Sequence, residues 1–155
     1  MFRIEAEDLQ VWEVTLPSAS FFELSGDLYS DLERYSDETG KEAAVVLAIL
    51  FPATFPYAPP FVRVVRPRFC FHTGHVTVGG SICLQILTQG EGKGYWKDDV
   101  TMASLLLLLY HLIAVDGKGR VDFGSSHNPH PERDYSLEEA KAAFERVARQ
   151  HGWLK

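Results

Sequence analysis

Apolar and polar positions in the first half of the chain predict β-strands. Residues 10–16 carry apolar side chains at every second position, and residues 43–51 form an uncharged, β-branched run typical of a central strand. The proline-rich segment 55–60 cannot supply ladder hydrogen bonds and predicts a rigid turn, after which residues 61–65 restart a strand. The three predicted strands form an antiparallel meander.

Helical spacing is found in three further segments. Apolar residues recur at i, i+4 and i+7 within 26–35, and the leucine-rich segment 100–115 predicts a buried core helix. Asp98 and Asp99 are expected at the start of that helix, where its dipole favours carboxylates. A Ser-x-x-Glu capping box begins the last predicted helix at Ser136. Together these segments predict an α+β fold, with a small antiparallel sheet backed by helices.

Composition fits a soluble globular protein. The 155 residues are 46% hydrophobic and 23% charged, which predicts one domain spanning residues 1–155. The formal net charge of −6 argues against binding to a nucleic-acid backbone. The charge is uneven, because residues 1–60 hold 11 acids and 3 bases whereas residues 61–155 hold 10 acids and 12 bases. This uneven distribution of charge favours protein partners over nucleic acid.

Neither a membrane span nor a secreted protein is expected. The most apolar stretch, 100–115, has 16 residues, whereas a membrane-spanning helix needs about 20. No apolar leader follows Met1, and two cysteines do not form a disulfide framework. We therefore expect a cytoplasmic, or alternatively a nuclear, protein without a membrane partner.

Cys83 is the main candidate for chemistry, and two interpretations remain open from its neighbours alone. It could be a small hydrophobe among Ile82, Leu84 and Ile86, or a nucleophile at a loop edge whose flanking glycines let a partner's backbone approach. A free thiol with an ordinary pKa of about 8.5 is about 3% thiolate at neutral pH, which suffices for thiol–thioester exchange.

A metal site is a weaker alternative. Cys70, His72, His75 and Cys83 are zinc-ligand types, but their spacing matches none of the usual structural zinc patterns. A metal-binding regulatory domain thus remains a minor alternative, and no metal is assigned.

Other candidate residues have ordinary structural interpretations. No phosphate-binding glycine loop and no Gly-x-Ser-x-Gly elbow is present, so no nucleotide cofactor is expected. Trp12, Trp96 and Trp153 are expected as core anchors. His127 and His130 are expected to be solvated in a polar loop.

Several motifs follow one another in a specific order. A Phe-Pro-x-x-Pro-Pro motif ending at Pro60 precedes a strand, a glycine loop, Ile82-Cys83-Leu84, a tryptophan and the leucine-rich helix. Residues 61–65, 79–83, 117–124 and 135–137 add to the pattern. From about residue 9 to residue 153, the chain resembles the ubiquitin-conjugating enzymes, and most closely their Q subfamily.

The resemblance implies a ubiquitin-conjugating-enzyme-like fold and a transthiolation cycle. Cys83 would accept ubiquitin, or a ubiquitin-like modifier, as a thioester from an activating enzyme. It would then pass the modifier to a lysine or to a ligase's cysteine. ATP is spent on the activating enzyme, so no cofactor is implied here. A catalytically silent variant that only binds ubiquitin or a ligase is the alternative, although such variants usually lack the cysteine.

Further roles follow from the same resemblance. His75 occupies the place of the asparagine in the family's His-Pro-Asn triplet, which the Q subfamily also lacks, and its ring N–H could stabilise an oxyanion. Asp116, 33 residues after Cys83, could hold an incoming lysine.

Two regions bear on the partners that the resemblance implies. Pro59, Pro60 and the longer loop leading to Trp96 would dock a ligase. Only about eight residues precede the first predicted strand, so the family's N-terminal helix is expected to be short or missing.

Overall fold

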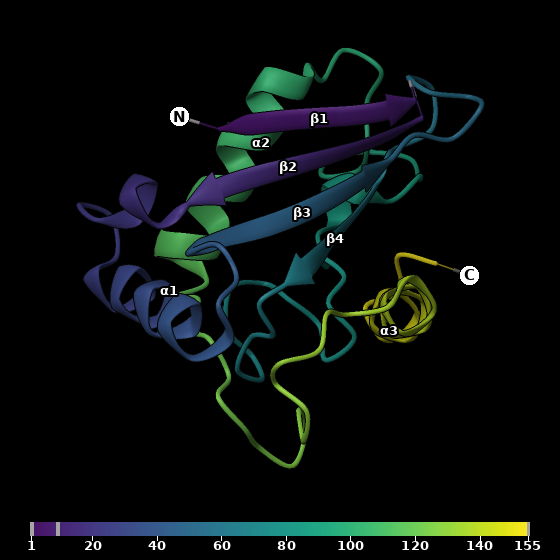
Figure 1. The fold of residues 1–155 in the computed structure, drawn as a ribbon. Helices are drawn as coiled ribbons and strands as arrows, with labels where there is room; N and C mark the ends of the chain where they lie inside the picture. Colours follow the sequence, from purple (N-terminus) through teal and green to yellow (C-terminus); the bar gives the residue numbers. More distant parts are fainter. Residues whose placement is uncertain (1, 9, 155) are drawn as a thin grey trace.

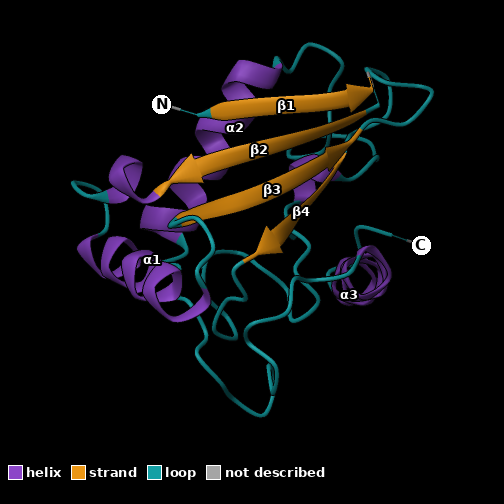
Figure 2. Cartoon of the chain, viewed as in Figure 1, coloured by secondary structure: helices purple, strands orange, loops and turns teal. Residues whose placement is uncertain are grey.

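The computed structural model describes residues 2–8 and 10–154, which fold around a four-stranded antiparallel sheet (Figures 1 and 2). The strands follow one another in the order β1-β2-β3-β4, so each pairs with its neighbours in sequence. The predicted antiparallel meander is therefore confirmed, and the three predicted strands correspond to β2, β3 and β4. The strands are β1 (Arg3–Asp8), β2 (Val11–Pro17), β3 (Ala44–Leu50) and β4 (Phe61–Arg66).

β1 is the strand that the sequence pattern did not predict. It pairs with β2 at the edge of the sheet, with Ile4 opposite Val14. Residues 3–6 are exposed, so backbone pairing rather than burial of an apolar face holds this strand. Hydrophobic periodicity arises from burial, and an exposed edge strand leaves no such pattern. Among the described residues no helix precedes this strand.

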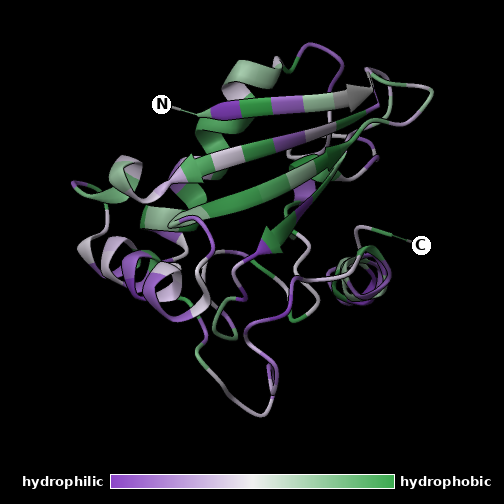
Figure 3. Ribbon diagram, viewed as in Figure 1, coloured by the Kyte–Doolittle hydropathy of each residue, from purple (hydrophilic) through white to green (hydrophobic). Residues whose placement is uncertain are grey.

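The structure describes three α-helices around the sheet. Figure 1 shows α2 across one face, where Leu105 and Leu109 are buried in the same hydrophobic core as Leu47 of β3. The hydropathy colouring of Figure 3 shows that β3 is apolar along most of its length. In the part of the chain that the structure describes, no helix is long and apolar enough to cross a bilayer. The helices are α1 (Gly26–Thr39), α2 (Met102–His111) and α3 (Leu137–Gln150).

Helix boundaries differ from the predicted ones at three places. α1 is longer than predicted, and α2 begins later and ends earlier, at His111, where a π-helical turn (Leu112–Asp116) follows. The side chain of Thr101 caps α2 by accepting a hydrogen bond from the Ser104 N–H (3.2 Å). Asp98 and Asp99 therefore precede the first turn, and the expectation that they start the helix is wrong. The capping box of α3 is confirmed.

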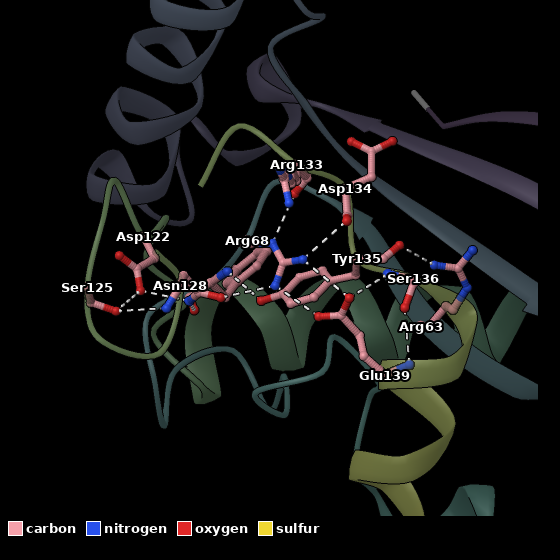
Figure 4. Close-up of polar contacts among 11 residues, drawn as sticks. Arg63, Arg68, Asp122, Ser125, Asn128, Arg133, Asp134, Tyr135, Ser136 and Glu139 are labelled. Carbon is pink, nitrogen blue, oxygen red and sulfur yellow. Dashed lines mark hydrogen bonds and ion pairs between the residues drawn. The ribbon is translucent and has the colours of Figure 1, made fainter. Parts of the chain in front are cut away.

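Arg68, just after β4, connects the sheet to α3, and Figure 4 shows its contacts. Its guanidinium donates to the carboxylate of Glu139 (2.9 Å) and to the backbone carbonyls of Arg133 (2.9 Å) and Asp134 (3.2 Å). It also lies over the ring of Tyr135, 4.6 Å from the ring centroid. One side chain thus fixes both the loop before α3 and the first turn of α3.

A second polar cluster fixes the loop that follows Asp122. Asn128 is 1% exposed, and its Nδ2 donates to the carbonyl of Phe69 (3.1 Å) and to the carboxylate of Asp122 (2.7 Å). Burial alone would raise the pKa of Asp122, but hydrogen bonds from Asn128, Ser125 and Gly124 outweigh this effect and lower the pKa. The loop therefore has a defined shape without regular secondary structure (Figure 4).

Asn128→Ala should lower the free energy of unfolding by about 1–3 kcal/mol, because it removes the buried amide that donates to both Asp122 and Phe69. Urea unfolding followed by circular dichroism measures the change. Ser126→Ala, at an exposed position of the same loop, is the matched control and should stay within about 0.5 kcal/mol of wild type. Equal stabilities for the two variants would contradict the role of Asn128.

Candidate active site

Cys83 lies where the chain leaves a tight hairpin next to β4. The N–H of Ile82 donates to the carbonyl of Val62 in β4 (3.0 Å), and the N–H of Cys83 donates to the carbonyl of His75 (3.1 Å). The hairpin is closed by an antiparallel bridge between Val76 and Ile82. The backbone at Cys83 is therefore held by the sheet on one side and by the loop carrying His75 on the other.

Gly79 and Gly80 are required by packing within this chain. A Cβ at Gly79 would lie 2.1 Å from the carbonyl oxygen of Glu139 in α3, and one at Gly80 would lie 2.4 Å from Cγ of Tyr135. Gly80 also has a φ of +95°, which other residues rarely adopt. The expectation that these glycines let a partner's backbone approach is therefore wrong, because Gly79 lets α3, and Gly80 the preceding Tyr135, approach the hairpin instead.

The Cys83 thiol is half-buried, and burial raises its pKa to about 11. No charged group among the described residues offsets this effect. The sequence-based value of about 8.5, with about 3% thiolate, is therefore wrong for this site. At pH 7 the thiolate fraction is on the order of 10⁻⁴. At neutral pH the thiol is therefore a slow nucleophile unless an electrophile is held against it.

Cys83 opens into a cavity of about 680 Å³, a volume typical of ligand-binding pockets. Its walls come from four parts of the chain, which are the loop 71–78, the turn at residues 116–117, His127 and the last turns of α3. Val76 and Val147 supply apolar surface. Packing between α3 and the hairpin thus creates a pocket beside the thiol.

His75 and Asp116 meet in the wall of this cavity, with Nε2 2.9 Å from Oδ2. Their loops are joined by the N–H of Gly74, which donates to the carbonyl of Gly117 (2.8 Å). An ionised carboxylate only accepts hydrogen bonds, so Nε2 carries the proton and Nδ1 of the neutral ring keeps a lone pair. The structure therefore brings both predicted helper residues to the same cavity as Cys83.

Phe71 and His127 belong to the cavity but were not predicted there. Their rings stack, with centroids 4.5 Å apart and planes inclined by 15°. His127 is exposed, as expected for a solvated residue, yet its ring also lines the cavity. The polar cluster around Asn128 shapes the loop that carries His127. No local sequence motif indicates that this loop places His127 in the wall of the cavity. Arg146 and His151 of the α3 region also line the cavity.

Asp31 of α1 fixes the chain between two of these walls. Its carboxylate accepts a hydrogen bond from Nε of Arg120 (2.7 Å) and another from the N–H of Val121 (3.1 Å). This contact holds the segment between Asp116 and the loop that carries His127. Because the Asp31 side chain is buried, losing either of these hydrogen bonds would destabilise the fold. The far walls of the cavity are thus anchored to the rest of the fold.

The predicted ligase-docking residues are partly turned inward. Trp96 is 6% exposed and donates its Nε1–H to the carbonyl of Pro56 (2.7 Å), while Pro60 is buried and Pro59 half-buried. The expectation of direct partner contact is therefore corrected for the side chains of Trp96 and Pro60, because Pro60 is buried and Trp96 joins two loops. The expectation that Trp96 is a core anchor is confirmed. Tyr57, 72% exposed, is the side chain that this region presents to solvent.

The zinc alternative is not supported. Among the residues that the structure describes, no three His, Cys, Asp or Glu side chains lie close enough to hold a metal ion. Cys70 instead donates its thiol to the carbonyl of Val121 (3.3 Å). Burial, and then the carboxylates of Asp122 and Asp31, raise its pKa. Its thiol therefore has a different environment from that of Cys83.

Comparison with known proteins gives consistent matches. The family model of the ubiquitin-conjugating enzymes matches residues 41–122. A Q-like ubiquitin-conjugating enzyme protein of Drosophila melanogaster is 31% identical, with 99% of this chain and 49% of that protein covered. Human ubiquitin-conjugating enzyme E2 Q1 is 32% identical, with 81% of this chain and 28% of that protein covered. A human Q-like ubiquitin-conjugating enzyme protein is 29% identical, with 96% of this chain and 83% of that protein covered. This chain thus spans about half the length of the first relative and less of the second.

The rate of Cys83 alkylation by iodoacetamide should rise about tenfold per pH unit between pH 7 and 10, because only the thiolate reacts and the pKa is about 11. Mass spectrometry of the Cys70→Ala variant follows Cys83 alone. The same variant unfolded in urea is the control. Its alkylation rate plotted against pH should have a midpoint near pH 8.5, the ordinary pKa of a free thiol. A midpoint near 8.5 in the folded protein would contradict the effect of burial.

Proposed function

The chain belongs to the ubiquitin-conjugating enzyme family, and on this premise we propose that it carries ubiquitin, or a ubiquitin-like modifier, as a thioester on Cys83. The observation that carries the proposal is the opening of the Cys83 thiol into a cavity whose wall contains the His75–Asp116 pair. Cys70 is the less suitable thiol, because it donates to a backbone carbonyl away from this pair.

In the first step, the Cys83 thiolate attacks the modifier's C-terminal carbonyl, which the activating enzyme holds as a thioester. A carbon–sulfur bond forms at Cys83, the bond to the activating enzyme's sulfur breaks, and the proton lost by Cys83 returns to that leaving sulfur through solvent. A thiolate of high pKa is a strong nucleophile but is scarce, so docking must hold the two sulfurs together. ATP is consumed earlier, and this cycle needs no cofactor on this chain.

In the second step, a lysine amine or a ligase's cysteine attacks the thioester and the Cys83 thiolate leaves. A thiolate of high pKa is a slow leaving group, so transfer depends on groups that position and deprotonate the acceptor. Asp116 attracts the incoming ammonium, and the free Nδ1 of His75 accepts one of its protons. The amine then forms the carbon–nitrogen bond as the carbon–sulfur bond breaks, and its second proton passes through solvent to the departing Cys83 sulfur. The resulting imidazolium is stabilised by the Asp116 carboxylate. In this arrangement His75 acts as a base when neutral, and donates to an oxyanion through Nδ1 only when protonated.

The partners of this cycle are ubiquitin or a ubiquitin-like modifier, an activating enzyme and a ligase. Tyr57 and the neighbouring Pro59 form the ligase contact in this proposal, since Tyr57 is exposed whereas Trp96 and Pro60 are buried. Cys83 must remain a free thiol, which fits the reducing environment of the cytosol or nucleus.

Incubation with activating enzyme, ATP and ubiquitin should give an adduct that reductant removes, because a thioester exchanges with thiols. Wild type and Cys70→Ala should form it, and Cys83→Ala should not, as seen on gels run with and without reductant. Thermal unfolding of each variant controls for folding. An adduct in Cys83→Ala that persists under reductant would assign the modifier to another residue. Absence of any adduct in folded wild type would leave the catalytically silent alternative.

Substitutions of His75 should slow discharge of the loaded protein to free lysine by about 10²-fold, because the acceptor loses its base. His75 has a φ of +58°, so glycine and asparagine are the substitutions that its backbone accepts best. His75→Asn keeps an N–H donor without a base, whereas His75→Gly has neither. Single-turnover discharge between pH 6 and 9 measures both.

A base role predicts that both variants are slow. A rate near wild type for His75→Asn alone would assign the oxyanion role instead. His130→Ala, an exposed histidine paired with Glu132, is the matched control. Charge reversal at Asp116 should also slow discharge, and an unchanged rate would exclude that residue from the reaction.

A further inference from the structure

The α3 side of the cavity carries a basic group without a partner. Arg146, Val147 and Gln150 line the cavity together with His151, which follows the helix. The Arg146 side chain is exposed, and no hydrogen bond or ion pair joins it to another residue that the structure describes. Arg68 differs in this respect, because its guanidinium binds Glu139.

The charged and titratable groups that face the cavity are mostly basic. Asp116 is the acidic residue of the lining, and His75 already binds it. Besides Arg146, the lining contains His75 and three further imidazoles, those of His72, His127 and His151. Arg146 is therefore the permanently charged side chain of the lining that has no partner among the described residues. The cavity therefore favours an anionic occupant.

Apolar surface lies beside these basic groups. Val76, Val78 and Val147 line the cavity, and the stacked rings of Phe71 and His127 form one side. A mixed surface of this kind suits a peptide segment that combines an apolar stem with a carboxylate. The same cavity contains the Cys83 thiol and the His75–Asp116 pair, so its occupant lies next to the reacting atoms.

We propose that this cavity is the acceptor subsite and that it selects a lysine with an acidic side chain a few residues away, held by Arg146. The inference rests on the proposed function and adds to it a class of acceptor. The lysine amine is directed to the His75–Asp116 pair and the acidic side chain to the opposite, α3 side. Arg146 is a specificity residue in this arrangement and takes no part in the bond changes.

The test compares peptides that contain one lysine and, at each position within three residues of it, glutamate, glutamine or arginine. Single-turnover discharge from loaded wild type should favour the best-placed glutamate peptide over its glutamine counterpart by about fivefold, the effect of an exposed ion pair. Arg146→Glu should abolish this preference and favour arginine instead.

Lys141→Glu is the matched control, because it makes the same charge change at an exposed position of α3 outside the cavity lining. It should keep the wild-type preference. Loading of Cys83 is measured separately and should be unchanged in both variants. Slower loading in Arg146→Glu alone would show that the cavity holds the modifier's tail, and equal discharge to all three peptide types would show no selection. Either result overturns the proposal.

Binding of the fluorescent glutamate peptide to the unloaded protein, followed by anisotropy, tests the cavity even if no thioester forms. Wild type should bind it about fivefold more tightly than Arg146→Glu does. If wild type fails to load but shows this difference, the conjugating function fails while the acidic-peptide site stands. Equal binding by the two proteins would overturn the site itself.

Discussion

The guanidinium of Arg68 joins the end of β4 to the loop before α3 and to the first turn of that helix. α3 buries mainly small side chains, namely Ala140, Ala143 and Ala148. These alanines bring the helix close but remove little apolar surface from water, so burial alone fixes its position weakly. Arg68, lying over the ring of Tyr135, supplies the directional contacts that place α3. The cavity beside Cys83 exists because α3 is held there.

The same close approach explains the chemistry of the thiol. α3 packs against the hairpin at Gly79, and Cys83 at the end of this hairpin is half-buried, without a cation among the described residues to stabilise its thiolate. Many nucleophilic cysteines are activated by a neighbouring imidazolium or a helix N-terminus. Here burial raises the pKa, so in the proposed function the reactivity of Cys83 comes from the activated thioester and from positioning. A thiol of high pKa reacts slowly with electrophiles free in solution, which suits the acyl-carrier role proposed for Cys83.

Local sequence patterns determined much of the fold and indicated the candidate nucleophile. The meander of β2, β3 and β4, the core helix α2 and the capping box of α3 follow from periodicity and capping, which depend on near neighbours. The order of motifs around Cys83 indicated the family, which the comparisons show, and it also led to His75 and Asp116.

Only the tertiary structure decided the properties that depend on distant residues. β1 was missed because an exposed edge strand has no apolar period. Trp96 was expected both as a core anchor and as a docking residue, and the structure confirms the core anchor alone. The pKa of Cys83 could not be read from its neighbours in sequence, because burial depends on what packs against it. Likewise, Arg146 and His127 lie far from Cys83 along the chain, and long-range packing of α3 and its preceding loop brings them to one cavity.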